Sequence, residues 1–530
     1  MSLPAIVAAM LRPAFYPHPA PAVELVQSHI SYVLLAGDHV YKVKKPVRFT
    51  FLDFSTLELR RHFCHEEVRL NRRLAPDLYR GVVALCRDGE GFRLGPEEDP
   101  AAVEYAVHMR RLPAGCSLDV LLERRQVTPA MIDRVAVRLA AFHRDAAGGP
   151  AVTANGDPAA VRRVLDDNYG NARRFRDVTV PAADDDAIQA FASAFLRDHA
   201  PVFRRRQAEG RIRECHGDLH TEHICFAADL EIFDCIEFNP LFRYCDVASE
   251  IAFLAMDLDY HDEPTLAAHF VARYAHHAQD AELPWLVPFY QCYRAYVRGK
   301  VDSLKSAEEE VPAAERQAAH DSARRHFALA YRYTWAYTPA LIVVCGLSGT
   351  GKTVLAEALC ARTGFVHVNS DLVRKRLAGV PPLARSEPAA YDAGLYSPEM
   401  SARTYQTMLD EAAAHLAAGR GVVLDATFQL RAGRDSVRAI AAAAGVPFLV
   451  VECQCAEAEV ARRLAARTQR GDSPSDADWA VYREQRRRFE PFAPEERADV
   501  VTLDTAGGTD AAVRRVEAAV RRRQCVKPKT

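Results

Sequence analysis

The feature that most constrains the fold of this chain is a glycine-rich stretch that begins at Gly346. It reads "GLSGTGKT", so that Gly346 and Gly351 have the G-x-x-x-x-G-K-T spacing with Lys352 and Thr353. The apolar run "LIVVC" (341–345) precedes it, and the helix-forming run "VLAEALCART" follows it. A position between a strand and a helix is the setting that a P-loop requires.

The residue types of this stretch suit phosphate binding. Glycines let backbone N–H groups curl around phosphate oxygens at the positive end of the following helix. The lysine is expected to reach the β- and γ-phosphates of ATP, and the threonine to bind Mg²⁺. The predicted ATP-binding residues of this loop are Gly346, Ser348, Gly349, Thr350, Gly351, Lys352 and Thr353.

Two further strands are predicted to end in aspartates. The segment "GVVLDATF" (421–428) indicates a buried strand that ends in Asp425, placed to hold the Mg²⁺ shell as a Walker-B acid. The segment "FVHVNSDLVRKRL" (365–377) indicates a strand that ends in Asp371, with a helix starting near Leu372. Because ligands bind at the carboxyl ends of strands in open α/β sheets, Asp371 is a candidate catalytic residue. The alternative is that it only caps its helix.

An arginine-rich segment follows farther along the chain, "AEAEVARRLAARTQRGDSPSDADWAVYREQ" (456–485). Arg463, Arg467 and Arg470 are expected to close over the phosphates as a lid. The alternative for each arginine is a place on a solvated helix face.

Together these segments resemble the small P-loop kinases, a group that includes chloramphenicol phosphotransferase, the zeta toxins and the kinase domain of polynucleotide kinase. The resemblance covers roughly residues 338–525. It implies that the γ-phosphoryl group of ATP is transferred to a hydroxyl, that Asp371 is the general base, and that Arg374 binds substrate or phosphate. A motor-type AAA ATPase is disfavoured because the sequence "LDAT" gives Asp425 no acidic neighbour to activate water.

The N-terminal part contains a second concentrated motif, "CHGDLHTEHICF" (215–226). One interpretation is a zinc site, since His220, His223, Cys215 and Cys225 supply suitable ligand types. The paired CxxC spacing and the HExxH helix of zinc sites are missing, however.

The other interpretation is the catalytic hairpin of a kinase-like fold. A loop with Asp218 precedes a short strand "HICF", a turn at 227–230, and a strand "EIFD" that ends in Asp234. In such a hairpin the first aspartate takes the proton of the acceptor hydroxyl, and the second chelates Mg²⁺ on the ATP phosphates.

This motif resembles the aminoglycoside phosphotransferase and choline kinase group, whose pattern is HGDxxxxN followed by a strand and D-x-x-E/D. The resemblance implies that Asp218 is the base and Asp234 the metal ligand, that Glu237 assists with metal, and that Asp246 braces the loop. The chain departs from the pattern because His223 replaces the metal-binding asparagine, and imidazole is a poorer Mg²⁺ ligand than a carbonyl oxygen. Sequences of the form HGDL.TEH resemble a subfamily of fused aminoglycoside-phosphotransferase-like and ATP-binding proteins.

The upstream segment "SYVLLAGDHVYKVKKPV" (31–47) predicts a hairpin whose second strand carries the ATP lysine. Lys42 is the first choice, because Val40 precedes it as in the V-A-I-K motif, and Lys44 is the alternative. Glu67, or else Glu66, is its expected partner on a helix within 55–76. A solvent-exposed glutamate is the competing interpretation.

The predicted fold is an α+β protein-kinase-like domain with two lobes, followed by an α/β P-loop domain with a mostly parallel sheet. We place the domains at 1–337 (small lobe about 1–112, large lobe about 113–337) and 338–530, with the boundary at "AYTPA" (336–340).

Net charge, apolar runs and cysteine spacing limit which partners and which cell compartment are expected. The net charge of −2 gives no bulk attraction to nucleic acid. The sequence has no signal peptide and no apolar run long enough for a membrane span. Because the 13 cysteines have no framework spacing, we expect a cytoplasmic protein with reduced thiols.

The sequence therefore predicts a bifunctional enzyme that uses ATP and Mg²⁺ to phosphorylate small-molecule hydroxyl acceptors. In one alternative, only the P-loop domain is active and the N-terminal domain is an ATP-sensing or docking module. In another, the chain is a non-enzymatic, nucleotide-gated regulator. The sequence does not identify the phosphoryl acceptor. The acidic segment "DLDYHDE" (257–263) would suit an aminoglycoside in the N-terminal domain. Nucleic-acid ends are not excluded as acceptors of the P-loop domain.

Overall fold

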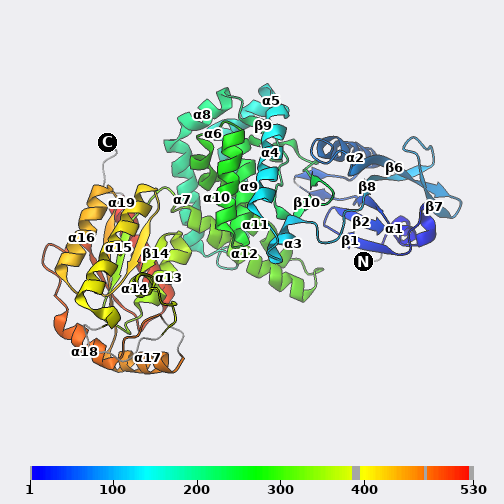
Figure 1. The fold of residues 1–530 in the computed structure, drawn as a ribbon. Helices are drawn as coiled ribbons and strands as arrows, with labels where there is room; N and C mark the ends of the chain where they lie inside the picture. Colours follow the sequence, from blue (N-terminus) through cyan, green and yellow to red (C-terminus); the bar gives the residue numbers. More distant parts are fainter. Residues whose placement is uncertain (1–2, 50, 385–393, 471–473, 525–530) are drawn as a thin grey trace. The chain divides into compact units, whose positions relative to one another are not determined.

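The computed structural model describes residues 3–49, 51–384, 394–470 and 474–524 (Figure 1). Contacts within the chain divide it into two compact units, Met1–Ala330 and Tyr331–Thr530. The division falls in the last turn of helix α12 (Ala313–Tyr333), a few residues before the boundary proposed from sequence.

The first unit begins with an antiparallel sheet in the strand order β1-β2-β3-β8-β6-β7. Its strands are β1 (Val23–Gln27), β2 (Ser31–Ala36), β3 (His39–Lys44), β6 (Tyr79–Asp88), β7 (Gly91–Gly95) and β8 (Ala102–Arg110). Two short strands, β4 (Arg48–Phe49) and β5 (Leu52–Asp53), pair with each other between β3 and helix α2.

The predicted lysine hairpin is β2–β3. Its register pairs Ala36 with His39 around a tight turn, and Gly37 in that turn has a φ of +58°. Since side chains alternate along a strand, Lys42 lies on the opposite face from Tyr41 and Val43, which are buried in the core. The hairpin thus presents its lysines to the second face of the sheet.

Helix α2 (Leu57–Asn71) covers that second face. It begins after Thr56, whose side chain accepts a hydrogen bond from the N–H of Leu59, as expected for a helix cap. Cys64 and Val68 pack against sheet residues such as Val107. The same helix carries Glu67 toward the lysines of β3.

The rest of the first unit is mainly helical, with two small antiparallel ladders, β9–β12 and β10–β11, between the helices. The strands are β9 (Ile212–Glu214), β10 (Ile224–Phe226), β11 (Leu230–Ile232) and β12 (Tyr244–Asp246). The helices are α1 (Ala5–Met10) beside the sheet, then α3 (Leu118–Glu123), α4 (Pro129–Asp145), α5 (Pro150–Thr153), α6 (Pro158–Ala172), α7 (Ala182–Asp198), α8 (Ala200–Ala208), α9 (Val247–Tyr260), α10 (Pro264–His277) and α11 (Leu283–Ser306). The predicted catalytic hairpin is β10–β11.

The second unit is a parallel sheet in the order β14-β15-β13-β16-β17. Its strands are β13 (Leu341–Cys345), β14 (Val366–Asn369), β15 (Val422–Asp425), β16 (Phe448–Gln454) and β17 (Val500–Asp504). Its helices are α13 (Lys352–Thr363), α14 (Ser370–Ala378), α15 (Pro398–Ala417), α16 (Arg431–Ala443), α17 (Glu457–Arg470), α18 (Trp479–Arg488) and α19 (Thr509–Gln524).

The central strand β13 is buried along its whole length, as its unbroken apolar sequence predicts. Residues of β13 and β15 share a core with Met408 of α15 and Val437 of α16. The strand order places the carboxyl ends of β13, β14 and β15 next to one another. No helix in the described ranges has both the length and the apolar character needed to cross a membrane.

Candidate functional site

In the second unit the predicted P-loop connects β13 to α13, which begins at Lys352. Gly346, Gly349 and Gly351 have φ values of +132°, +81° and +88°, a region that other residues rarely adopt. A side chain on Gly346 would also collide with the carbonyl oxygen of Cys453, at 2.5 Å from its Cβ. The glycines therefore let the loop curl back over the end of the strand.

Asp425 lies at the end of β15, next to this loop. Its carboxylate accepts a hydrogen bond from Asn369 at 2.6 Å and lies 3.3 Å from Nε2 of His367, and the side chain of Thr353 is close enough to lower its pKa. Burial acts to raise the pKa of Asp425, but the hydrogen bond from His367 and the charge of Lys352 bring it below its usual value. A charged carboxylate beside the threonine hydroxyl is a donor set that fits Mg²⁺.

Asp371 lies in the first turn of α14, at the neighbouring strand end. The helix begins at Ser370 rather than near Leu372, and its cap is Asn369, whose Oδ1 accepts from the N–H groups of Asp371 and Leu372. The carboxylate of Asp371 is thus not needed as the cap. Burial raises its pKa, against the opposing charge of Arg374. A carboxylate with a raised pKa is suited to act as a general base.

The predicted substrate and lid arginines have different surroundings. Arg374 is buried, donates to Ser401 at 3.1 Å, and lies over the ring of Tyr396. Arg463 is not a free lid residue: it donates to the carbonyl of Thr505 and to Glu459, close to Gly351.

Arg467 also differs from the expected open lid, since it donates to the carbonyl of Ala477. The side chain of Arg470 lies outside the described residues. In this structure Arg463 and Arg467 donate hydrogen bonds to other residues of the protein. Their closure over bound phosphates stays a prediction.

In the first unit, both candidate lysines contact Glu67. Lys42 lies 2.9 Å from Glu67 and 2.5 Å from Asp234, and it lines a cavity. Lys44 lies 2.7 Å from the other oxygen of Glu67, and its side chain is 0% exposed. Lys42 is therefore the lysine placed to meet a ligand, whereas Lys44 is enclosed by protein.

Glu237 was expected to assist with metal, but the structure places it against Lys44. The carboxylate is buried, and the ammonium group of Lys44 neutralises its charge. Burial raises the pKa of Glu237, and the charge of Lys44 opposes the rise. Its position is that of an ion-pair partner rather than of an open metal ligand.

The loop with Asp218 is held by Glu250 of α9. One oxygen of Glu250 accepts hydrogen bonds from the backbone N–H groups of His216 and Gly217, each at 2.7 Å, and the other lies 2.6 Å from His143. The expected brace, Asp246, instead accepts two hydrogen bonds from Arg206. Sequence reasoning missed Glu250, because it reads as one more residue of an apolar helix.

His216 links this loop to the metal aspartate, since its Nε2 lies 2.8 Å from the carbonyl of Phe233. The next residue, Asp234, has a φ of +63°, a strained conformation for a side-chain-bearing residue that is common at functional sites. Burial opposes ionisation of Asp234, but the charge of Lys42 holds its pKa well below its usual value.

His223 lies between the two aspartates. Its Nδ1 is 2.8 Å from the carbonyl of Asp218, and its Nε2 is 3.5 Å from Oδ2 of Asp234. Ligand atoms of Asp218, His220 and His223 also lie within 4.8 Å of one another. Two imidazoles and a carboxylate fit a first-row transition ion better than Mg²⁺, because Mg²⁺ takes oxygen ligands whereas transition ions also bind nitrogen.

The cysteines do not form the zinc site that was the other interpretation. Cys225 is bonded to Cys116 in a disulfide, which corrects the expectation of reduced thiols. Cys215 is buried, and burial raises the thiol pKa. Cys215 does belong to a second buried group, with His143 and Glu250, but all three already make the contacts of the loop brace or of the core.

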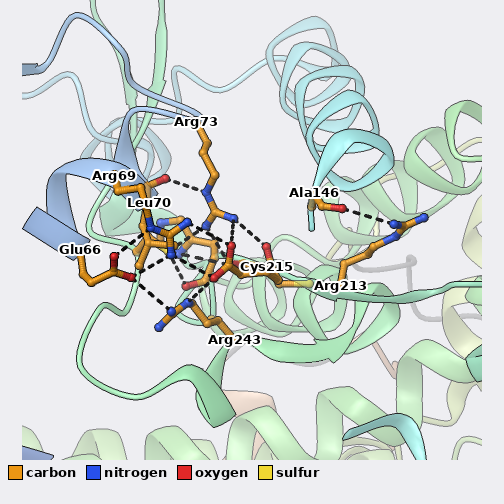
Figure 2. A network of polar contacts seen from close by, with 12 residues as sticks. Glu66, Arg69, Leu70, Arg73, Ala146, Arg213, Cys215 and Arg243 are labelled. Atoms are coloured by element: carbon orange, nitrogen blue, oxygen red, sulfur yellow. Dashed lines mark hydrogen bonds and ion pairs between the residues drawn. The ribbon is translucent and has the colours of Figure 1, made fainter. Parts of the chain in front are cut away.

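Arginines in α2 and just after it connect this helix to the strand that leads into the Asp218 loop. Figure 2 shows Arg73 donating to the carbonyls of Leu70 and Cys215, with Arg69 and Arg243 beside Glu66. Because α2 also carries Glu67, this network connects the helix that holds the lysine pair to the strand before the Asp218 loop.

A cavity of about 1060 Å³ in the first unit brings the predicted residues together. Lys42, Asp218 and Asp234 line it. So do residues 109–112, at the end of β8, and the apolar residue Val40. Such a volume is at the upper end of the range for ligand pockets, roughly 300–1,000 Å³.

Comparison with known proteins gives matches to both parts of the chain. Residues 341–492 match the model of a protein family described as "AAA domain". The chain is 32% identical over 463 residues to the uncharacterized protein Rv2004c of Mycobacterium tuberculosis, covering 87% of this chain and 89% of that protein. The uncharacterized protein Mb2027c of Mycobacterium bovis matches equally well. Since 463 residues exceed either unit, the similarity extends over both.

Similar solved structures are more distant. A choline/ethanolamine kinase family protein from Mesorhizobium loti is 15% identical, with a TM-score of 0.36, covering 62% of this chain and 97% of that chain. A sugar kinase from Janibacter sp. HTCC2649 is 18% identical, with a TM-score of 0.27, covering 34% of this chain and 95% of that chain. These scores are too low to carry an argument about either unit.

Proposed function

This chain belongs to the protein family that includes Rv2004c of Mycobacterium tuberculosis, and we propose that it is an ATP-dependent phosphotransferase with two nucleotide sites. The observation that carries the proposal is the position of Asp425 at the end of β15, beside the strand that leads into the P-loop, with Asp371 at the next strand end. This grouping provides a phosphate cradle, a metal position and a base at one sheet edge.

In the second unit, the proposed reaction is in-line transfer of the γ-phosphoryl group to a hydroxyl. The P-loop N–H groups and Lys352 orient the phosphates, and Asp371 receives the proton of the hydroxyl. Thr353 and Asp425 would hold Mg²⁺, which supplies charge neutralisation on the phosphates when bound. The residue that follows Asp425 in the chain is Ala426 and not an acid, which favours transfer to an acceptor over motor-type ATP hydrolysis.

In the first unit, Lys42 orients the phosphates from its position on Glu67, and Asp218 receives the proton. Burial acts to raise the pKa of Asp218, but His220 and the more distant Arg298 bring it well below its usual value. Asp218 is therefore charged at neutral pH and able to orient a hydroxyl.

A second candidate function has one specific observation in its favour. Lys42 contacts Asp234 directly at 2.5 Å, and His223 takes the place of the usual asparagine. Both features would suit a first unit that senses or docks a nucleotide without transferring phosphate, while the P-loop unit alone is an active kinase.

The test compares Asp218→Asn, Lys352→Ala and the double variant for ATP consumption across a library of hydroxyl acceptors. The matched control is Asp229→Asn, which removes an exposed carboxylate from the turn of the same β10–β11 hairpin. Two active sites predict that each single variant loses turnover with a different set of acceptors, and that the double variant loses both.

If Lys352→Ala abolishes all turnover and Asp218→Asn none, only the P-loop unit is a kinase. If no variant or wild-type protein transfers phosphate while ATP still binds, the chain is a nucleotide-gated regulator instead.

A further inference from the structure

The cavity of the first unit extends past Asp218 to a region between α6 and α11. This region is lined largely by aliphatic side chains, which favours a ligand with an apolar body. The side chains that define this region, the acceptor pocket, are Val161, Val164, Leu165, Val297, Val301 and Leu304.

Aromatic side chains extend the apolar lining toward solvent. Phe49 and Phe51 line the cavity although they are 43% and 44% exposed, and their rings stack with centroids 5.7 Å apart. Phe51 also lies 6.2 Å from the ring of Phe242, another lining residue. Large exposed aromatics around a cavity mouth are typical of a binding site for apolar molecules.

The same pocket carries three positive charges of α11, those of Arg294, Arg298 and Lys300. Arg294 donates to the carbonyls of Ser249 and Gly217, and Lys300 donates to the amide oxygen of Asn168. Nε of Arg298 is buried and has no hydrogen-bond partner. Over the ranges that the structure describes, none of these three cations forms an ion pair.

The carboxylates near Arg298 are engaged elsewhere. Asp302 contacts His326 at 3.0 Å, and Asp257 accepts hydrogen bonds from the backbone and side chain of Thr221. Burial opposes the charge of Arg298, while Asp302 and Asp218 favour it and raise its pKa, so this charge is partly balanced at a distance. Its buried Nε still lacks a hydrogen-bond acceptor, so an anion that binds beside Arg298 would be favoured.

The carboxylates that line the cavity mostly have cations of their own. Asp234 contacts Lys42, Glu237 contacts Lys44, and Asp246 is held by the buried Arg206. The acidic segment 257–263 contributes no lining residue among those the structure describes. The pocket therefore presents cations that make no close ion pair among the described residues, rather than the acidic surface that an aminoglycoside would need.

We propose that the acceptor of the first unit is an amphiphilic anion, a hydroxyl-bearing molecule with an apolar body and a carboxylate or phosphate group. This inference rests on the proposed phosphotransfer at Asp218. The acceptor oxygen forms a bond to the γ-phosphorus of ATP, the bond from that phosphorus to the leaving ADP oxygen breaks, and the hydroxyl proton passes to Asp218. Arg298 and Lys300 hold the anionic group, since guanidinium and ammonium groups pair with carboxylate and phosphate.

The test measures binding by calorimetry on the full chain without ATP, so it does not depend on turnover. The probes are 10-hydroxydecanoate, 10-hydroxydecyl phosphate and 10-aminodecan-1-ol, which share an apolar chain and a hydroxyl but differ in charge. We expect the two anions to bind and the amine not to bind. The anion that binds more tightly shows whether the pocket prefers a carboxylate or a phosphate group.

The variants Arg298→Gln and Lys300→Gln should each weaken binding of the anions about 10- to 100-fold, the loss expected for a charge-assisted hydrogen bond. Lys305→Gln removes a charge from the same helix outside the cavity and should leave binding unchanged. Arg298→Lys keeps the charge and should restore part of the affinity, which separates loss of charge from a folding defect.

Equal or tighter binding of the amine overturns the inference, and so does unchanged anion binding in both glutamine variants. If the anions bind as expected but receive no phosphate from ATP, the acceptor pocket is supported and the proposed activity of the first unit fails.

Discussion

Nε2 of His223 faces Oδ2 of Asp234 at 3.5 Å, while Nδ1 of the same ring lies 2.8 Å from the carbonyl of Asp218. A carbonyl can only accept, so Nδ1 carries the proton and the lone pair of Nε2 points toward a carboxylate. Burial and the neighbouring His220 lower the pKa of His223, which favours this neutral form. A histidine held in this way by its other nitrogen is typical of metal ligands.

We therefore predict that the first unit binds Mn²⁺ in preference to Mg²⁺. His223→Ala, which leaves no ligand at this position, should reduce Mn²⁺ affinity by at least about tenfold, since even the loss of an outer partner of a ligand costs that much. Paramagnetic resonance titration of Mn²⁺ measures this without turnover. His277→Ala, an exposed histidine on α10, is the control. Equal Mn²⁺ affinity in His223→Ala and wild type would contradict the prediction.

The two lysines of β3 should respond differently to substitution. Lys44→Met leaves Glu67 and Glu237 buried without this ammonium group, which should cost about 3–5 kcal/mol of unfolding free energy. Lys42→Met should leave a folded protein that loses ATP affinity in the first unit, because Lys42 lines the cavity. Urea unfolding and nucleotide binding, measured on both variants, distinguish the roles. The reverse assignment of the two effects would make Lys44 the ATP lysine.

Glu250 makes the stability of the first unit depend on pH. Burial acts to raise its pKa, but hydrogen bonds from His143 and the Gly217 N–H lower it from 4.5 to about 2. A depressed carboxyl pKa stabilises the fold above the unfolded value and loses that contribution as pH falls toward the folded value. We expect a loss of about 3 kcal/mol between these limits, at 1.36 kcal/mol per pKa unit.

Thermal unfolding from pH 5 to pH 2 checks this, with Glu250→Gln beside wild type. The variant should be less stable at pH 7 and should lose less stability on acidification. Parallel pH dependence in the two proteins would mean that another group is responsible.

The sequence predicted the elements whose chemistry is local. The P-loop, the strand that ends in Asp425, and the β10–β11 hairpin each depend on residues close in the chain, so their spacing is enough to identify them. Spacing favoured Lys42 over Lys44, because Val40 precedes Lys42, but it left Lys44 as an alternative. Both lie on the same face of β3, and the distinction comes from Glu237, far along the chain, which encloses Lys44.

Contacts between distant segments account for the other differences. Glu250 braces the Asp218 loop because α9 passes behind it, which no spacing within "SEIAFLAMD" indicates. The cations of α11 read as an ordinary polar pattern on a helix. They become unusual only because α6 and the catalytic loop enclose them in a cavity.

Because Cys116 and Cys225 form a disulfide, we predict that reduction increases the number of thiols that can be titrated. Denatured protein prepared without reductant should titrate two fewer thiols than the same protein after reduction. The bond closes a long loop, with a sequence separation of 109, so its removal in Cys116→Ser should cost up to about 4–5 kcal/mol of unfolding free energy. The free buried Cys292 gives a control, since Cys292→Ser should not change the difference between the two titrations. An unchanged thiol count on reduction would show that the bond does not form.

In the second unit, the pH dependence of turnover should reflect the ionisation of Asp371. Burial raises the pKa of Asp371 above 3.8, and the Arg374 guanidinium opposes that rise. A base must be deprotonated to act, so turnover falls as pH drops through this pKa. Removing the opposing charge in Arg374→Gln should raise the pKa further and move the acid limb of kcat/KM to higher pH.

The profile should be recorded in an Asp218→Asn background, which silences the first unit. Arg376→Gln is the matched control, because Arg376 lies on the same helix but is exposed and paired with Glu411. A loss of kcat/KM in Arg374→Gln without any shift of the acid limb would mean that Arg374 binds substrate but does not tune Asp371. A shift to lower pH would contradict the role of Asp371 as the base, since losing a nearby positive charge can only disfavour the carboxylate.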